Sequence, residues 1–154
     1  MDLAATFRKA RRPVIYTRQA TAPDGADAGM MAKWWEDLCY DGTEDSEILP
    51  QLKPEPVDTV IRKTRYNAFM GTELDSILRG LGVRDIVITG VMTNVCCETT
   101  ARDAFMRDYR VFFCADGTGS QSEELHLGSL RALAYAFAKI VTTKEMRDIV
   151  EGKK

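Results

Sequence analysis

The sequence predicts an α/β protein in which a mostly parallel sheet is covered by helices on both faces, a three-layer α/β/α arrangement. First, segments with strand character alternate with segments of helical periodicity along the chain. Second, the strands are continuous apolar runs, such as Ile86-Val87-Ile88, which is typical of parallel strands buried on both faces. Third, no internal repeat or linker divides the chain, so residues 1–154 are expected to form a single domain.

Local signals define the elements of the N-terminal half. Residues 2–12 carry an apolar stripe of Leu3 and Phe7 and end in basic residues, which favours a helix with cations at its C-terminus. Pro13 ends that helix, and residues 14–17 form a short strand. The expected elements that follow are a loop over 19–29, a short helix over 30–39, a proline-containing loop over 40–56 and a strand over 58–62.

The C-terminal half continues the alternation. After a loop over 63–69, residues 72–82 are expected to form a helix with Leu74 and Leu78 on its apolar face, a cap at Thr72 and an end at Gly82. The remaining expected elements are a strand over 86–88 ended by Gly90, a helix with Cys96 in its first turn, a strand over 110–115, a loop over 116–120, a helix over 121–138, a strand over 139–141 and a last helix capped by Thr143.

Composition and charge exclude several classes of protein. The net charge of −2 shows no basic footprint for nucleic acid, and no apolar run approaches the ~20 residues of a membrane span. The basic residues near the N-terminus follow the apolar ones, the reverse of a secretory signal. Four cysteines match no zinc spacing, and a single histidine, His126, excludes a multi-histidine metal site within one chain. We therefore expect a cytoplasmic protein without metal or other cofactor.

Cys96 is the first candidate for chemistry, because it follows a buried strand and lies in the first turn of a helix. Unpaired N–H groups and the helix dipole at such a position favour a thiolate, which is the nucleophilic form. The same N–H groups can hold an oxyanion. The alternative interpretation is that Cys96 or Cys97 is a small buried apolar residue. Lys63 comes directly after another predicted strand, and parallel strands bring their carboxyl ends to one edge, so Lys63 and Cys96 are expected to meet.

The chain also resembles the isochorismatase-like cysteine hydrolases, a superfamily that includes nicotinamidases, N-carbamoylsarcosine amidases and ureidoacrylate amidohydrolases. The resemblance rests on four blocks that occur in order and cover nearly all of the chain from Pro13 onward: PVIYTR (13–18), VIRKTRYNAFMGTELDSILRGLGV (60–83), ITGVMTNVCCETTARDAF (88–105) and HLGSLRALAYAFAKIVTT (126–143). It implies a Rossmann-like version of the predicted fold.

The resemblance also implies roles for particular residues. Cys96, which follows Thr-Asn-Val, would be the nucleophile that forms an acyl intermediate with an amide or ureido carbonyl, and Lys63 its catalytic lysine. The backbone N–H groups of Met92 and Cys96 would form the oxyanion hole beside a cis Val91–Met92 peptide. The residues expected to contact a small-molecule substrate are Tyr66, Asn67, Phe69, Thr93, Asn94 and Trp34.

One part of the family pattern is missing from the sequence. Members carry a central first strand that ends in an aspartate, the proton acceptor for the cysteine, but only the helix over 2–12 precedes the strand at 14–17. We therefore expect a sheet without its N-terminal strand, and neighbouring strands with unpaired backbone groups. Three explanations are open: the chain is a fragment or a mis-started gene product, it is a natural short member that has lost hydrolysis, or another carboxylate or a partner chain replaces the aspartate.

Two classes of function remain open from the sequence. The first is a hydrolase of amide, ureido or carbamoyl C–N bonds with activity in doubt; a nicotinamidase is disfavoured because Gln19 stands where those members carry histidine. The second is a catalytically impaired binding or oligomer-forming module. A homo-oligomer is expected in either case, because Trp34, Trp35 and Tyr40 supply aromatic surface. A redox role for the adjacent Cys96 and Cys97 is a third possibility.

Overall fold

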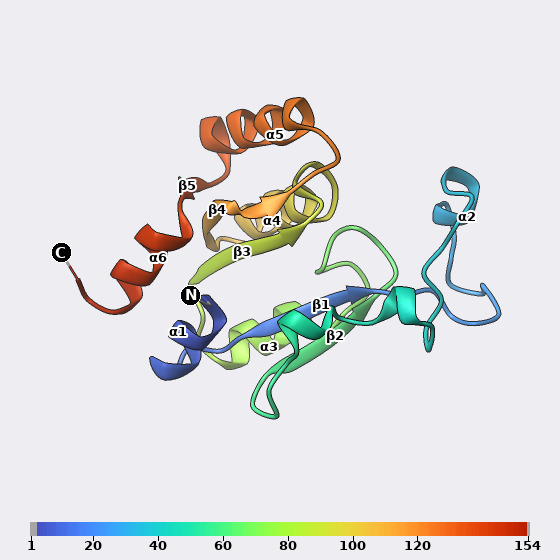
Figure 1. Ribbon diagram of the computed structural model, residues 1–154, viewed down its shortest axis with the longest axis horizontal. Helices are drawn as coiled ribbons and strands as arrows, with labels where there is room; N and C mark the ends of the chain where they lie inside the picture. The colour runs from blue at the N-terminus through green and yellow to red at the C-terminus, as the bar shows by residue number, and fades with distance from the viewer. Residues whose placement is uncertain (1–2, 154) are drawn as a thin grey trace.

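The computed structural model describes residues 3–153 of the chain. Its helices are α1 (Leu3–Lys9), α2 (Met31–Trp34), α3 (Leu74–Gly80), α4 (Glu98–Met106), α5 (Glu123–Ala136) and α6 (Thr143–Val150). Its strands are β1 (Ile15–Gln19), β2 (Thr59–Lys63), β3 (Asp85–Val91), β4 (Arg110–Gly119) and β5 (Lys139–Val141). Shorter helical turns are η1 (Glu44–Ser46), η2 (Pro50–Leu52) and η3 (Thr93–Cys97). Strands and helices alternate as the sequence predicts (Figure 1).

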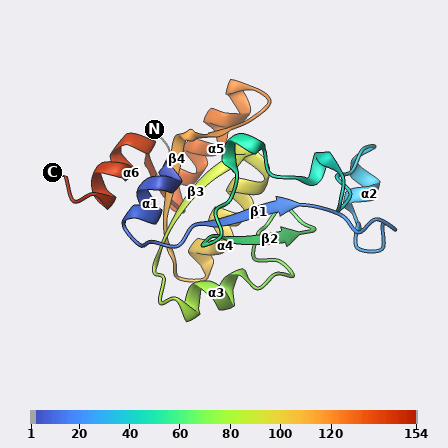
Figure 2. The same ribbon diagram turned by 60° about the horizontal axis from the view of Figure 1, so that its bottom comes forward.

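Helices cover both faces of the strands, which confirms the three-layer prediction. Alternate residues of β3 and β4 point to opposite faces because the side-chain period of a strand is two. On one face, Val87, Phe112 and Cys114 pack against α1 and α6, and these two helices lie together in both views (Figures 1 and 2). On the other face, Ile88 and Phe113 belong to the larger core with residues of α3, α4 and α5.

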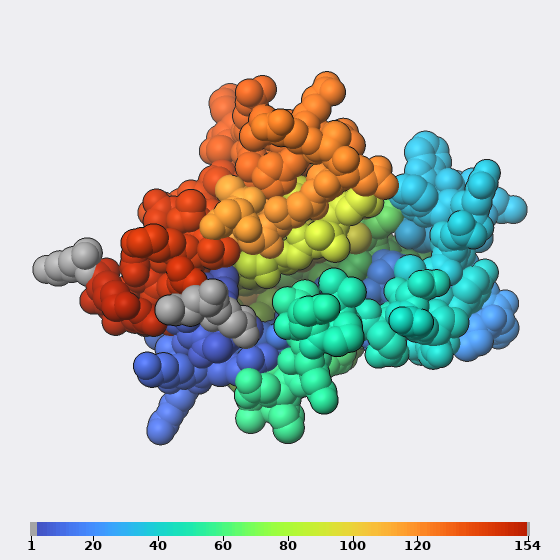
Figure 3. All heavy atoms as spheres, viewed as in Figure 1, coloured from blue at the N-terminus to red at the C-terminus, as the bar shows by residue number. Residues whose placement is uncertain are grey.

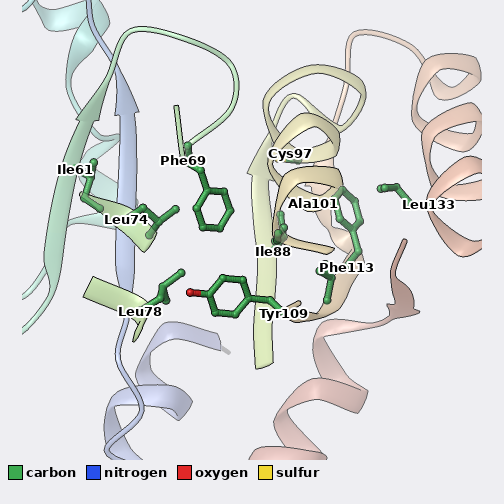
Figure 4. Packing of buried hydrophobic residues seen from close by; sticks show 13 residues of the cluster. Ile61, Phe69, Leu74, Leu78, Ile88, Cys97, Ala101, Tyr109, Phe113 and Leu133 are labelled. Carbon is green, nitrogen blue, oxygen red and sulfur yellow. The ribbon is translucent and has the colours of Figure 1, made fainter. Parts of the chain in front are cut away.

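The strands form two separate parallel groups. β1 pairs with β2, and β3, β4 and β5 pair in that order. β1 and β3 run in the same direction but do not pair, so that each is the edge of its group (Figures 1 and 4). Within residues 3–153 no strand lies between them. The sequence expectation of a sheet that lacks a central strand agrees with this arrangement.

The larger core joins the two groups of strands. Figure 4 shows the rings of Phe69 and Tyr109 between β1 and β3, with Ile61 of β2 on one side and Ile88 of β3 on the other. The two rings are stacked with their centroids 6.0 Å apart. Apolar burial, at roughly 25 cal/mol per Å² of apolar surface removed from water, therefore holds the groups together where backbone hydrogen bonds do not.

Two predictions about strand ends were wrong. β4 continues to Gly119 where a loop over 116–120 was expected, and β3 continues past Gly90 to Val91. Thr118 and Gly119 pair with Gly90 and Val91, after a register shift that follows Ile88. A Cβ at Gly117 would lie 2.9 Å from the Cβ of Cys114, so this glycine serves close packing rather than a turn. The prediction was wrong because strand pairing outweighs local turn preferences.

Several helix predictions also need correction at their ends. The N-cap of α3 is Glu73 rather than the expected Thr72. The helix expected over 30–39 is limited to α2, and Cys96 lies in η3, one turn before α4. The last helix is capped by Thr142 rather than Thr143: the Thr142 hydroxyl accepts from the Glu145 N–H, and the Glu145 carboxylate accepts from the Thr142 N–H. Thr143 instead donates its N–H and hydroxyl to Asp116. Adjacent threonines offer the same capping chemistry, so the sequence alone does not choose between them.

A buried carboxylate joins α1 to the start of β2. Arg8 Nε and Nη2 donate to Asp58 at 3.1 and 2.6 Å, and the Glu55 N–H donates at 2.7 Å. The Asp58 side chain is 1% exposed. The hydrogen bond from Arg8 is the main cause that lowers the pKa of Asp58 below its usual value.

We expect Arg8→Met to reduce the free energy of unfolding at pH 7 by about 3 kcal/mol, because it leaves a buried carboxylate unpaired. Since the pKa of Asp58 is lowered on folding, the contribution of the pair is complete above the unfolded value near 4 and is lost as pH falls through the folded value. Urea unfolding at pH 7 and pH 3 measures this difference, with the exposed Arg12→Met as control. An equal loss of unfolding free energy at pH 7 and at pH 3 would contradict this expectation.

Candidate active site

The structure brings Lys63 and Cys96 together at the carboxyl ends of the strands. Lys63 ends β2, Cys96 lies in η3 directly after β3, and Lys63 Nζ is 3.5 Å from Cys96 Sγ. Nζ also donates to Gln19 Oε1 and to the Arg65 carbonyl, both at 3.0 Å. These three neighbours match the three N–H donors of an ammonium group. The strand ends therefore place a fully engaged cation beside the sulfur.

The positive charge of Lys63 lies in a buried position. The residue is 5% exposed, and within residues 3–153 no Asp or Glu side chain forms an ion pair with it. A buried ammonium is costly unless an anion compensates for it. Of the three groups that accept from Nζ, two are neutral amide oxygens and the third is the Cys96 sulfur. A cation at this distance stabilises a thiolate over a thiol.

The turn that carries Cys96 has the backbone geometry that the resemblance implies. The Val91–Met92 peptide is cis, which confirms that expectation. The Met92 carbonyl accepts from the N–H groups of Val95 and Cys97, at 3.2 and 3.1 Å. The oxyanion role of the Met92 and Cys96 N–H groups remains a prediction that depends on this turn.

The two other cysteines of the core have a different environment. Cys97 is 5% exposed, and burial, with a smaller contribution from the neighbouring Cys96, raises its pKa to about 12. Burial, with a smaller contribution from Asp116, raises the pKa of Cys114 to about 11. Both are therefore almost wholly thiols near neutral pH.

We expect Cys96 to be the thiol that a short pulse of iodoacetamide alkylates first at pH 7. The Lys63 ammonium lies 3.5 Å from Cys96 Sγ, whereas burial keeps Cys97 and Cys114 as thiols. Peptide mass spectrometry after a series of quench times gives the order of labelling, and Cys96→Ser is the matched control. Faster labelling of Cys97 would reverse the assignment of the nucleophile.

The structure places an aromatic pair beside the loop that follows Lys63, and one of its members was not among the predicted residues. Trp35 Nε1 donates to the Tyr66 hydroxyl at 2.7 Å, so Trp35 links the α2 segment to this loop. Trp34 is 76% exposed. The sequence shows two adjacent tryptophans, which point in different directions, but gives no signal as to which of them faces the loop.

Two further predicted substrate-binding residues, Asn67 and Phe69, hold this loop on the core. Asn67 Nδ2 donates to Asp103 at 2.6 Å, and its Oδ1 accepts from the Phe69 N–H at 2.9 Å. Phe69 is 5% exposed. Both side chains are thus engaged within the fold, and their contact with a substrate stays a prediction.

Thr93 and Asn94, the last two predicted contact residues, are anchored to the first turn of α5 and to the segment before it. Thr93 is fully buried and its hydroxyl lies 2.8 Å from His126 Nδ1. Asn94 Oδ1 accepts from the Ser120 hydroxyl at 2.5 Å. Their side chains therefore fix the turn that precedes Cys96.

Gln19 and Arg65 are contacts of Lys63 that the sequence did not assign to the site. Gln19 stands opposite Lys63 in the β1–β2 register, which pairing of the two predicted strands would have indicated. Arg65 contributes its backbone carbonyl, and no side-chain pattern signals that. Among residues 3–153, no group of three or more His, Cys, Asp and Glu side chains could hold a metal ion.

A cysteine beside a buried lysine at the strand ends of a three-layer α/β fold defines a cysteine hydrolase class of site. Residues 1–145 match the isochorismatase domain model, so the chain belongs to this family of hydrolases.

Three similar proteins place the chain within the family. It is 41% identical over 148 residues to nicotinamidase 3 of Arabidopsis thaliana, covering 94% of this chain and 74% of the relative. It is 47% identical over 77 residues to the ureidoacrylate amidohydrolase of Variovorax paradoxus, which is 50% of this chain and 31% of the relative. A cysteine hydrolase structure from Pseudomonas syringae pv. phaseolicola matches with a TM-score of 0.95 and 31% identity, over 97% of this chain and 77% of the other.

Proposed function

We propose that the chain carries a hydrolase site for the C–N bond of a small amide, ureido or carbamoyl compound, and that its activity as the 154-residue chain is impaired. The observation that supports this most is the 3.5 Å contact of Cys96 Sγ with the buried Lys63 ammonium at the strand ends. Family membership supports hydrolysis, and the likeness to an amidohydrolase and a nicotinamidase supports C–N bonds.

The proposed reaction has two steps. The Cys96 thiolate attacks the carbonyl carbon, and the carbonyl oxygen becomes an oxyanion that accepts from the Met92 and Cys96 N–H groups. The C–N bond then breaks, the nitrogen leaves with a proton taken from solvent water, and a thioester remains on the sulfur. Water attacks the thioester, releases the acid and returns the thiolate. Tyr66, Trp34 and the loop over 63–69 are proposed to contact the rest of the substrate.

The proposed impairment concerns the proton that the leaving nitrogen must receive, for which we find no general acid–base among the described residues. Lys63 stabilises the thiolate, but its ammonium already donates to three acceptors and cannot accept a proton. Within the described residues no carboxylate contacts Lys63 Nζ. Loss of a general acid–base typically costs 10²–10⁴-fold in rate, roughly 3–5 kcal/mol of barrier.

The test is ammonia release from a panel of substrates at high protein concentration. A ureido acid and an N-carbamoyl amino acid are the proposed class, whereas nicotinamide represents the class suggested by the Arabidopsis relative. We propose the former because Gln19, not histidine, accepts from Lys63. Activity that disappears in Cys96→Ala supports the site. Turnover that survives this substitution would overturn it.

The alternative function is a catalytically impaired module that binds a small molecule or forms oligomers. The exposed arm between β1 and β2 favours it, since Figure 3 shows this segment in cyan standing out at one end of the molecule. Met30, Trp34 and Tyr40 are exposed there. Among residues 3–153 no helix is both long and apolar enough to cross a membrane. Separately, we propose a cytoplasmic location.

We expect a homo-oligomer in solution through this exposed arm, because aromatic side chains are enriched at protein interfaces. Sedimentation velocity at micromolar concentration measures the mass of the assembly. Trp34→Lys is expected to shift it toward the monomer, whereas Lys33→Glu on the same helix is the matched control. A wild-type monomer would remove this expectation.

A further inference from the structure

The only histidine of the chain contacts the turn that carries the nucleophile. His126 lies in the first turn of α5, where its N–H donates to the Ser122 carbonyl at 3.1 Å. The Ser122 hydroxyl caps the same helix by accepting from the Leu125 N–H at 3.3 Å. The His126 ring is therefore carried by a capped helix end, and its Nδ1 meets the hydroxyl of the fully buried Thr93 at 2.8 Å.

Thr93 is the first residue of η3, the turn that carries Cys96. It directly follows Met92, whose carbonyl accepts from the N–H groups of Val95 and Cys97. Because Met92 precedes Thr93 and Cys96 follows it, rotation of the backbone at Thr93 would change the direction of the Met92 N–H group relative to the Cys96 N–H group. A buried hydroxyl that loses its partner carries the cost of an unsatisfied group, so the contact with His126 adds to the backbone hydrogen bonds that oppose such a rotation.

We propose that His126 is a positioning residue, which acts through the Thr93 hydroxyl to hold the N–H groups of Met92 and Cys96 toward the reacting carbonyl oxygen. The inference rests on the proposed function, because it presupposes attack by Cys96. The Asn94–Ser120 hydrogen bond links the turn to the segment before α5, and the Thr93 carbonyl accepts from the Glu98 N–H, but neither of these bonds holds the Thr93 side chain. His126 thus acts on the orientation of the turn and not on the sulfur.

Two probes separate orientation of the turn from reactivity of the sulfur. Iodoacetamide forms a bond from the thiolate to a methylene carbon and releases iodide, and no oxyanion develops. A small aldehyde forms a bond from the thiolate to its carbonyl carbon, the C=O electron pair moves to the oxygen, and a solvent proton completes the hemithioacetal. Only the second reaction requires donors toward an oxyanion.

The variants are His126→Leu, Thr93→Val and the conservative His126→Asn, whose amide can replace Nδ1 as the partner of Thr93. We expect His126→Leu and Thr93→Val to weaken the aldehyde adduct about tenfold or more, because small misplacements of oxyanion donors are costly. The rate with iodoacetamide should stay within about threefold of wild type, since it depends on the thiolate alone. The double variant should lose no more than either single one, and His126→Asn should recover the adduct.

The outcomes distinguish the inference from the proposed function. Equal weakening of both reactions in His126→Leu, or failure of His126→Asn to recover the adduct, would mean a purely structural role. An unchanged aldehyde adduct would overturn the inference while Cys96 chemistry stands. No Cys96-dependent adduct in the wild type would overturn both. If a thermal melt shows that His126→Leu does not fold, the aldehyde test is decided by Thr93→Val, which keeps the shape of the side chain.

Discussion

An extended form of the chain, with an added N-terminal strand that ends in aspartate, is expected to hydrolyse ureido and carbamoyl amides 10²–10⁴ times faster than the 154-residue chain, the typical contribution of a general acid–base. β1 and β3 run in the same direction without pairing, so one parallel strand between them would join the two groups. Its carboxyl end would lie at the edge that holds Lys63 and Cys96, because parallel strands end together.

The control for this experiment is the same extension with asparagine in place of aspartate. It should restore the sheet and raise the melting temperature, because it satisfies unpaired backbone groups. It should not restore the rate, since the amide cannot take a proton. If the 154-residue chain turns over within tenfold of the aspartate form, the aspartate is not needed and another group carries the proton.

Lys63→Met is expected to slow the alkylation of Cys96 at pH 7 by about tenfold or more, the effect of removing an opposite charge within 4–6 Å. Methionine keeps the length of the side chain but removes the ammonium that lies 3.5 Å from Cys96 Sγ. Pulse labelling with iodoacetamide measures the change.

The matched control is Lys139→Met, which removes an exposed ammonium at the start of β5. Lys139→Met should leave the rate of Cys96 alkylation unchanged. That result would show that a change in net charge alone does not slow the reaction. An equal rate in Lys63→Met and in the wild type would mean that the lysine does not stabilise the thiolate.

The sequence predicted the alternation of strands and helices, the three layers and the meeting of Lys63 with Cys96. These depend on apolar periodicity and on where strands end, which are local signals. The extension of β4 to Gly119 was missed, because the pairing of Thr118 with Gly90 is decided by a distant strand. The register of β1 with β2, which sets Gln19 opposite Lys63, is likewise tertiary information.

The surroundings of the site were less predictable than its two central residues. Asn67 and Thr93 were predicted as substrate contacts, and the structure shows their polar groups engaged with Asp103 and His126. A polar residue near a nucleophile looks the same in a sequence whether it supports the fold or faces a substrate. The contact of His126 with Thr93 spans 33 residues and no local pattern signals it.

The central claim, that Cys96 is a nucleophile poised by Lys63, can be tested without any proton acceptor. An activated ester with a nitrophenolate leaving group needs no proton on that group, so the 154-residue chain should form the acyl adduct whatever its rate of amide hydrolysis. Intact-protein mass spectrometry followed by peptide mapping should find one acyl group, on Cys96, and none in Cys96→Ala. An acyl group on Cys97, or acylation that persists in Cys96→Ala, would contradict the account.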